Sequence, residues 1–585
     1  MSPVTEGYLS RRTWLEAAAA AGVALVLSLV VFGPILGSLS GPLGGGDMLA
    51  TYVNAENWGG FGYSTSTHFG FPLGMNLNYS PNIDITENGF AGLVNVVSGS
   101  PFLGINLMLF LSFPLVAALA YLLMRLVSRG GPIAIALAVA FTFIPFHLGR
   151  GLGHTYLATL YGAMTGLALA LVICLGVLPD SLRRGARHRT ISIVLLAALV
   201  VSTAWSGLYY ATFGIILGGA ALVWRLVKGD PWRRLLAYAI PVASIGVLAI
   251  VGFIPGAIAI LGNPPDSPLS ERSAYESVTF AGSLALALLP APLSRLPFLA
   301  PYNEFAGRAA NGAPPYENTA LTNYGTWITT ACLVVFVVGW LVRARRGTVG
   351  DRPLALLAYL TAVVVAFFVP WGLNFLFANV VTPQVRAWNR LLPLLLLLFC
   401  LGAMAVVAGT RWDAMSRWAV ALSVVILGIV VVEQLVPFRS AYRQGAEDGQ
   451  GMWTAAQEYA SAVNAAIPQR CGVLQLPYVV YPEQGTIEQL DDYQHFWQPL
   501  ANPDKDFSYG AVKYTDASEP LAGLGNQQSR QQIAELKRMG FCAIHLDKRG
   551  FTDKAWTWLT NNMVQDFGAP VAQGYEGNWQ AYRLP

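Results

Sequence analysis

Eleven apolar runs with few charged residues dominate this 585-residue sequence. The first, from Leu15 to Leu36, is long enough to cross a bilayer as a helix, which takes about 20 mostly apolar residues. Only 12% of the residues are charged, against about 25% in an ordinary soluble domain. The sequence therefore predicts an α-helical polytopic membrane protein. The predicted spans are 15–37, 102–127, 132–148, 157–178, 191–206, 208–226, 236–262, 326–342, 354–370, 391–409 and 418–437.

Lysine and arginine are distributed unevenly between the loops that join these spans. If the N-terminus is cytoplasmic, 18 of the 36 Lys and Arg residues fall in cytoplasmic loops, and the outer loops of the membrane part hold six. Basic residues concentrate in cytoplasmic loops. Arg11 and Arg12 precede an apolar run too long for a signal peptide, so this run is predicted to remain as the first span. The C-terminus is then predicted to lie outside.

The composition changes after the last predicted span. Residues 1–437 form the predicted transmembrane domain, with long outer loops at 38–101 and 263–325. Residues 438–585 are polar, and strand-like and helical segments alternate along them. This pattern predicts a C-terminal extracytoplasmic α/β domain with a partly parallel sheet.

Two of the five cysteines lie outside the predicted spans. Cys471 precedes the predicted strand 472–476, and Cys542 lies in the predicted strand 541–546. Both fall on the oxidising side of the membrane, where disulfides persist. We predict a Cys471–Cys542 disulfide; the alternative is two buried free thiols that act as small apolar residues.

Asp47 is the first candidate catalytic residue. It follows the first span by about ten residues, after three glycines at Gly44, Gly45 and Gly46. Attack by a hydroxyl group needs a base to take its proton, and a partly buried carboxylate with a raised pKa suits that role. The alternative is that Asp47 caps a helix over 48–58, since Asp is a favoured N-cap residue.

A second acidic pair, Asp84 and Glu87, lies in the same loop. Three residues apart, the two carboxylates can share one face of a helix. They are candidates to bind an acceptor or a metal ion. The competing interpretation is a solvated helix start.

Histidines and arginines at two span ends are candidate ligands for an anionic headgroup. Arginine binds phosphate in a bidentate manner, and the amides of a helix start can add to that contact. The alternative role is interfacial anchoring. Two arginines four residues apart repel each other, which favours an anion between them. The candidates are His147, Arg150 and His154 after the third span, and Arg386 and Arg390 before the tenth.

Several motifs along the chain are familiar from other proteins. They are Phe71-Pro72-Leu73-Gly74-Met75-Asn76-Leu77, Pro145-Phe146-His147 with Arg150-Gly151 and Gly153-His154, Pro383-Gln384-Val385-Arg386-Ala387-Trp388-Asn389-Arg390, Gln475-Leu476-Pro477-Tyr478, Pro482-Glu483, Asp492-Tyr493, Ser508-Tyr509-Gly510 and Gly540-Phe541. Together they resemble a family of bacterial multi-span proteins described as glycosyltransferases or sugar translocases. More widely, the chain resembles the GT-C superfamily, although the paired Asp-Glu common in that superfamily is absent at Asp47.

The resemblance implies a GT-C-like fold in the bacterial plasma membrane and transfer of a sugar from a polyprenyl-phosphate donor to a cell-envelope glycan or glycolipid. Asp47 would be the base of an inverting reaction, and the histidines and arginines would hold the donor phosphate. Tyr478, Tyr493 and Trp497 in the tail would stack on sugar faces. No cofactor is certain; a divalent cation, Mg²⁺ or Mn²⁺, could accompany the acidic pair. No nucleic acid is expected as a partner.

Two other functions compete with transfer. A lipid-linked sugar translocase (flippase) should line its path with charged residues in mid-membrane. The predicted spans are almost uncharged at their centres, and the polar residues gather at one face, which favours chemistry at that face. The third possibility is a non-catalytic scaffold for cell-wall assembly.

Overall fold

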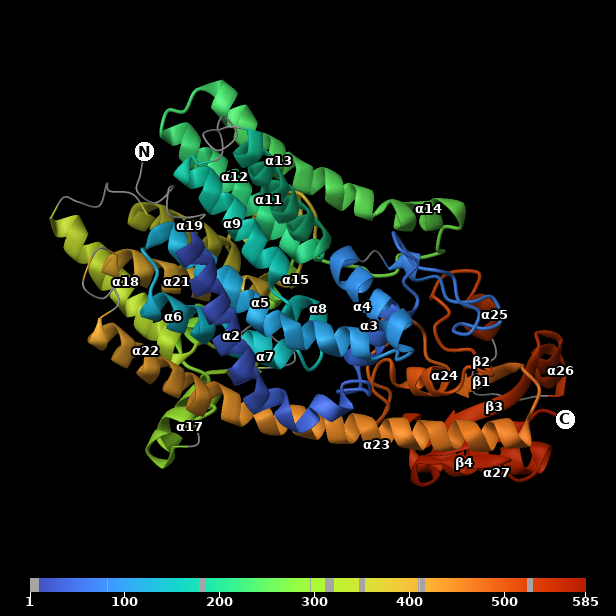
Figure 1. The fold of residues 1–585 in the computed structure, drawn as a ribbon. Coiled ribbons are helices and arrows are strands. Elements are labelled where there is room, and N and C mark those ends of the chain that lie inside the picture. Colours follow the sequence, from blue (N-terminus) through green and yellow to red (C-terminus); the bar gives the residue numbers. More distant parts are fainter. Residues whose placement is uncertain are drawn as a thin grey trace.

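The computed structural model describes residues 10–80, 83–177, 186–294, 296–310, 320–346, 353–408, 410, 416–522 and 530–585. A helical bundle forms one end of the molecule, and a small sheet with its helices forms the other (Figure 1). The long helices of the bundle are α2 (Arg11–Phe32), α5 (Leu103–Val127), α6 (Pro132–Thr142), α9 (Tyr161–Leu175), α11 (Ala186–Trp205), α12 (Leu208–Val227), α13 (Trp232–Gly252), α18 (Trp327–Arg345), α19 (Pro353–Phe368), α21 (Leu392–Val407) and α22 (Arg417–Val430).

Shorter helices join these elements. They are α3 (Asp47–Glu56), α4 (Ile85–Ser98), α7 (Pro145–Arg150), α8 (Thr155–Ala158), α14 (Ile254–Gly262), α15 (Glu276–Thr279), α16 (Leu284–Leu288), α17 (Ala300–Ala310) and α20 (Leu373–Val380), with 3₁₀ turns η1 (Gly33–Ser38), η2 (Leu77–Tyr79), η3 (Pro297–Leu299), η4 (Ala320–Asn323) and η5 (Trp388–Leu391).

The predicted helical membrane architecture is confirmed, with a smaller number of clear spans. Among the described residues, nine helices are long and apolar enough to cross a membrane, or ten if the pair α19 and α20, bent by 62°, is one span. The predicted span 191–206 corresponds to α11, whose apolar part Arg189–Trp205 is shorter than the others. Two of these spans each contain two helices that meet near a proline: α7 begins at Pro145, and Pro255 lies in the first turn of α14.

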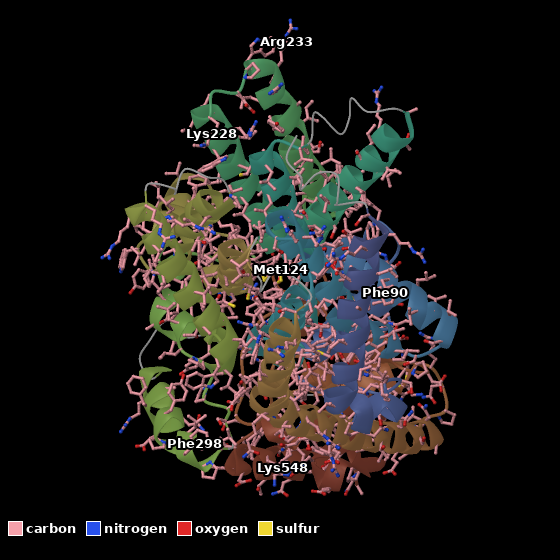
Figure 2. All side chains as sticks on the ribbon, turned by 60° about the vertical axis from the view of Figure 1, so that its left-hand side comes forward. Phe90, Met124, Lys228, Arg233, Phe298 and Lys548 are labelled. Atoms are coloured by element: carbon pink, nitrogen blue, oxygen red, sulfur yellow. A yellow bond between two sulfur atoms is a disulfide. The ribbon has the colours of Figure 1, made fainter. Side chains whose placement is uncertain are left out.

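Large apolar side chains remain exposed around the bundle. Val26 is 64% exposed, Val247 59% and Leu261 84%. Such a surface is stable only against lipid or another apolar partner. The charged ends lie apart: Lys228 and Arg233 are at one end of the molecule and Lys548 at the other (Figure 2).

A single helical run connects the bundle to the tail, residues 438–585. It passes from α22 through the π-helical turn η7 (Val431–Leu435) into α23 (Val436–Ala466). The boundary at 437/438 falls inside this run, so the division into domains 1–437 and 438–585 stays a prediction. The remaining elements of the tail are η8 (Gln494–Phe496), α24 (Trp497–Ala501), α25 (Glu519–Ala522), α26 (Arg530–Arg538), η9 (Lys548–Gly550), α27 (Asp553–Phe567) and η10 (Tyr575–Gly577), with the strands given below.

The tail contains a five-stranded sheet in the order β2-β1-β3-β5-β4. Strand β1 is parallel to both β2 and β3, whereas β5 is antiparallel to β3 and β4. The predicted partly parallel α/β fold is therefore confirmed. The strands are β1 (Gly472–Leu476), β2 (Asp506–Phe507), β3 (Phe541–Asp547), β4 (Ala572–Gly574) and β5 (Trp579–Arg583).

The first long loop, residues 38–101, pairs with the edge of this sheet. The backbone of Phe71 donates to the Phe507 carbonyl at 2.8 Å, and Phe507 donates to the His68 carbonyl at 2.9 Å. The two ring nitrogens of His68 contact the carbonyls of Lys505 and Pro499 at 2.7 and 2.8 Å. The edge strand β2 is thus covered by the loop that carries the acidic candidates.

A buried amide fixes the start of the same loop. Asn106 on α5 is fully buried and donates to the carbonyls of Leu39 and Gly41 at 2.8 and 2.7 Å. Its side-chain oxygen accepts from the Tyr52 hydroxyl at 2.8 Å, and that hydroxyl accepts from the backbone of Leu43. The backbone just before Asp47 is held by these contacts.

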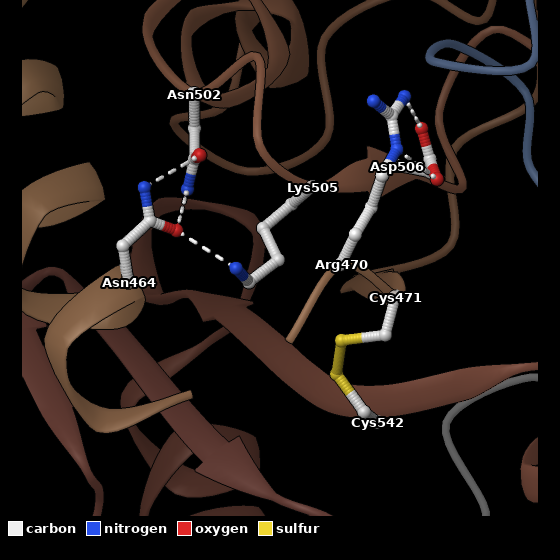
Figure 3. The surroundings of a disulfide bond; sticks show 7 residues. All are labelled: Asn464, Arg470, Cys471, Asn502, Lys505, Asp506 and Cys542. Atoms are coloured by element: carbon white, nitrogen blue, oxygen red, sulfur yellow. Dashed lines mark hydrogen bonds and ion pairs between the residues drawn. A yellow bond between two sulfur atoms is a disulfide. The ribbon is translucent and has the colours of Figure 1, made fainter. Parts of the chain in front are cut away.

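Cys471 and Cys542 are joined by a disulfide next to the paired strands β1 and β3, with Cα atoms 5.8 Å apart. Figure 3 shows the ion pair of Arg470 with Asp506 close to this bond. The bridge closes a separation of 71 residues. It ties the N-terminal end of β1 to the start of β3.

Thiol labelling tests the disulfide. In denatured, unreduced protein, a maleimide should label only Cys174, Cys332 and Cys400, and reductant should release two more thiols. In the chain-entropy model the bridge stabilises the tail by roughly 4 kcal/mol, so Cys471→Ser should lower the thermal denaturation temperature. Labelling of all five cysteines before reduction would contradict the bridge.

Candidate active site

Asp47 lies at the first position of α3, and Gly46 occupies the N-cap position with φ 57°. The interpretation of Asp47 as the helix cap is therefore wrong: glycine occupies the cap position with a positive φ that suits it, and no side chain caps the helix. The Asp47 side chain is 42% exposed, and its Oδ2 lies 3.4 Å from Nε2 of His154. Its carboxylate can therefore meet a substrate.

The segment that carries His154 is bound to the first long loop. Thr155 contacts the sulfur of Met48 at 3.0 Å, and the Tyr156 hydroxyl donates to Asn88 at 2.5 Å. These contacts join α8 to both α3 and α4. Asp47 and His154 are thus placed together by contacts of the residues that directly follow them.

Four charged groups from distant segments act on Asp47. Burial raises the pKa of Asp47, and the charge of Asp492 in the tail raises it further. The charges of Arg150 and Arg390 lower the pKa of Asp47, and the charge of Glu483 raises it by a smaller amount. The first long loop, two span ends and the tail therefore meet around one carboxylate.

The charge of Glu87 acts on Asp84, and Arg390 acts on both Asp84 and Asp47. Glu87 is 1% exposed, so the solvated helix start is wrong for this residue. Thr86 donates to Glu87 at 2.5 Å, and burial raises the pKa of Glu87 to about 7. Burial and the charge of Glu87 raise the pKa of Asp84, and the charge of Arg390 lowers it. Such a pair favours holding one proton between the two groups at neutral pH.

Arg386 and Arg390, predicted to act together on a phosphate, have different surroundings. Arg386 pairs with Glu276 at 2.7 Å and lies 4.9 Å from the centre of the Phe280 ring. The guanidinium carbon of Arg390 lies 4.1 Å from the centre of the Tyr209 ring. The charge of Arg390 lowers the pKa of Asp47 and of Asp84. Arg390 therefore belongs with the carboxylates Asp47 and Asp84, and Arg386 belongs with Glu276.

A chain of ion pairs links the second long loop, residues 263–325, to the tail. Glu276 lies between Arg386 and Arg272, with N–O distances of 2.7 and 3.8 Å. Arg272 also binds Glu483 of the tail at 2.9 Å. These contacts hold Glu483 in the part of the tail whose charges act on Asp47.

His147 lies in the helical core. It is fully buried, and its ring nitrogens contact the Ser112 hydroxyl and the Thr142 carbonyl, both at 2.7 Å. Its ring stacks on Phe113 with centroids 4.1 Å apart. Both nitrogens are engaged within the protein, so the structure gives no support to the predicted contact with a donor phosphate.

The three tail aromatics predicted to stack on sugars differ in how exposed their side chains are. Trp497 is 1% exposed and has no free ring face, which corrects that prediction. Tyr478 is half-buried, and its hydroxyl is 3.4 Å from the Ser518 carbonyl. Tyr493 is half-buried, and burial together with Tyr481 and Asp47 raises its pKa. Only Tyr493 is thereby brought near the Asp47 region.

Two acidic tail residues belong to the region around Asp47 although no role was predicted for them. Glu483 and Tyr493, the neighbour of Asp492, have φ of 57° and 67°, a conformation uncommon for residues other than glycine. Such backbone often persists at functional sites. The motifs Pro482-Glu483 and Asp492-Tyr493 were the available sequence signal, but nothing in them indicates pairing with the first loop.

The described residues bring three potential metal ligands together in the tail. Ligand atoms of His495, His545 and Asp547 lie within 4.8 Å of one another, and all three residues are buried. Nδ1 of His495 and Nε2 of His545 have no hydrogen-bond partner, but Asp547 is neutralised by Arg549 at 2.6 Å. The group is compatible with a divalent cation, although its two nitrogens suit a transition metal better than Mg²⁺.

Comparisons with known proteins find similarity at the level of the fold. No family model matches the chain, and no curated protein matches it. Arabinofuranosyltransferase AftD from mycobacteria aligns over 98% of this chain with a TM-score of 0.50 and 16% identity. A mutant form of AftD aligns over 98% of this chain with a TM-score of 0.50 and 14% identity. The chain spans only 40% and 42% of the length of these structures.

The helices and the fold together define a multi-span membrane protein whose fold is similar to that of a solved membrane-protein structure. Structures of AftD are among those that it resembles.

The contacts of His147 predict a structural role. Replacing it by Ala would remove the contacts of the ring with the Ser112 hydroxyl and the Thr142 carbonyl and open a cavity. We therefore expect a loss of about 3 kcal/mol or more in the free energy of unfolding. Thermal denaturation in detergent measures the loss. The control is His154→Ala, which removes a partly exposed side chain and should change the denaturation temperature little. Equal stability of His147→Ala and wild type would contradict the structural role.

Proposed function

We propose that this protein is a GT-C-type membrane glycosyltransferase that transfers a sugar from a polyprenyl-phosphate donor to a cell-envelope glycan or lipid acceptor. The observation that carries the proposal is Asp47. It is a partly exposed carboxylate with a raised pKa, subject to the charges of Arg150 and Arg390, in a fold similar to that of a glycosyltransferase.

The chemistry follows from these residues. The acceptor hydroxyl attacks the anomeric carbon of the donor sugar, and the bond from that carbon to the phosphate oxygen breaks, with the electron pair leaving on the phosphate. Asp47 takes the hydroxyl proton, and attack from the face opposite the leaving group inverts the anomeric centre. A raised pKa makes Asp47 a stronger base than an ordinary aspartate.

The two arginines suit the leaving group. Phosphate gains negative charge as the bond breaks, and fixed guanidinium groups in a site with little water stabilise that charge. Arg150 is only 3% exposed, so water screens it weakly. We assign Arg150 and Arg390 to the donor phosphate and Arg386 to the support of Glu276.

Asp84 and Glu87 are assigned to the acceptor or to a divalent cation. A neutral carboxyl in this pair can donate a hydrogen bond to a sugar hydroxyl, and its partner can accept one. Their oxygens are also the ligand type that Mg²⁺ and Mn²⁺ prefer. Tyr493, whose pKa the charge of Asp47 raises, would contact a sugar ring.

The location of the charged groups favours transfer over lipid translocation. A path for a flipped headgroup would need polar residues along the bundle. The charged groups described here instead gather around Asp47 at the tail end, and the basic Lys228 and Arg233 lie at the other end (Figure 2). We propose that the tail end faces outward from a bacterial plasma membrane and that the N-terminus is cytoplasmic.

Replacing Asp47 by Asn should lower transfer by about 10²–10⁴-fold, the usual contribution of a general base. The assay is sugar transfer from a polyprenyl-phosphate donor in detergent. Donor binding should remain, because Asn keeps the size of the side chain. Asp553→Asn is the control, since that carboxylate is 95% exposed and lies on the tail surface.

The pH profile separates a base from a merely structural carboxylate. Rates should fall as the pH drops through the pKa of Asp47, since the protonated form cannot accept the hydroxyl proton. Asp492→Asn removes a charge that raises this pKa, so the acidic limb should move to lower pH. Wild-type turnover in Asp47→Asn, or an unmoved limb in Asp492→Asn, would count against the assignment.

Donor affinity should respond to the two arginines. Arg150→Ala and Arg390→Ala each remove a charge-assisted contact to phosphate, worth roughly 1.5–3 kcal/mol. Binding of a polyprenyl-phosphate sugar can be measured by native mass spectrometry. The control is Arg308→Ala, an arginine of the second long loop that is 68% exposed. Unchanged affinity for the polyprenyl-phosphate sugar in both variants would indicate that these arginines have only a structural role.

A further inference from the structure

A groove of about 660 Å³ opens between α2, α6 and α22, far along the bundle from Asp47. Leu15 and Ala19 of α2 form one wall, Leu427 of α22 forms the other, and Ile135 and Ala136 of α6 form the floor. Helix α6 packs against both α2 and α22, so the groove has a continuous base. Its lining is almost entirely apolar.

The groove lies at the membrane end opposite the candidate active site. Helix α2 begins at Arg11 and, with η1, ends at Ser38, shortly before Asp47. Its 22 residues span about 33 Å, the thickness of the hydrocarbon core of a bilayer. Arg11 therefore lies at one interface and Asp47 at the other.

Charged residues line one mouth of the groove. Arg11 and Arg12 are exposed there, and Glu16 lies beside them with its Oε1 2.9 Å from Nε of Arg12. Glu16 also accepts from the Tyr121 hydroxyl, and the charges of Arg125 and Arg12 reach that tyrosine. Two guanidinium groups, of Arg11 and Arg12, and the carboxylate of Glu16 line the groove and give its mouth a net positive charge.

We propose that this groove binds an anionic glycerophospholipid, with an acyl chain between α2 and α22 and the phosphate at Arg11 and Arg12. The apolar lining suits an acyl chain, and the basic mouth at interface depth matches an anionic headgroup. A zwitterionic lipid would place its own cationic group beside the arginines. This site goes beyond the proposed function, because it is separated from Asp47 by the thickness of the membrane.

Native mass spectrometry of the full-length protein tests the site with phosphatidylglycerol and with phosphatidylcholine of the same acyl chains. We expect phosphatidylglycerol to bind more tightly and to raise the thermal denaturation temperature. The double variant Arg11→Gln/Arg12→Gln should weaken phosphatidylglycerol binding roughly 30-fold, since each basic residue near the surface contributes about 1 kcal/mol. Ala19→Phe, at an exposed position of the groove wall, should also lower binding without changing charge.

The matched control is Arg233→Gln/Arg234→Gln. These exposed adjacent arginines lie in the first turn of α13 at the same membrane end, and neither lines the groove (Figure 2). The control should bind phosphatidylglycerol as the wild type does. Equal binding of both lipids, or an equal loss in the two double variants, would mean that only bulk lipid or general surface charge is sensed and would overturn the proposal.

Discussion

Charged groups are excluded from the hydrocarbon core of a bilayer, and this constraint organises the molecule. The long helices satisfy their own backbone hydrogen bonds, which a spanning segment in lipid must do. The charged side chains that could bind or react with a ligand lie at the two ends of the bundle. At one end, Asp47, Arg150 and Arg390 meet acids of the tail. At the other end, Arg11 and Arg12 stand at the mouth of an apolar groove.

The candidate active site depends on contacts between segments that are far apart in the sequence. The first long loop pairs with the edge of the tail sheet through Phe71 and Phe507. The second long loop binds the tail through Arg272 and Glu483. Because these contacts bring Asp492 toward Asp47, the tail takes part in setting the pKa of the proposed base. A tail that only guided a glycan would not need this connection.

Local sequence patterns predicted the fold well and the site in part. Apolar runs identify helices because burial in lipid needs about 20 apolar residues, and the alternating strands and helices of the tail were also recognisable. Asp47 was identified as a candidate from the sequence, but its position directly after the N-cap residue Gly46 was not. The burial of His147 and Trp497 could not be predicted, since each depends on partners from other helices.

The arrangement of charge around Asp47 was the least predictable part. The roles of Arg386 and Arg390 look identical in the sequence, yet Arg386 pairs with Glu276 and the charge of Arg390 acts on Asp47 and Asp84. No pattern in the sequence indicates that Asp492 lies near Asp47. Such pairings are set by the topology of the whole chain rather than by local periodicity.

Cryo-electron microscopy with a non-hydrolysable polyprenyl-phosphate sugar analogue tests the central claim most directly. The account predicts phosphate density against the guanidinium groups of Arg150 and Arg390, with the sugar directed toward the carboxylate of Asp47. Phosphate bound at the opposite membrane end, or at the tail end without contact to either arginine, would contradict the account.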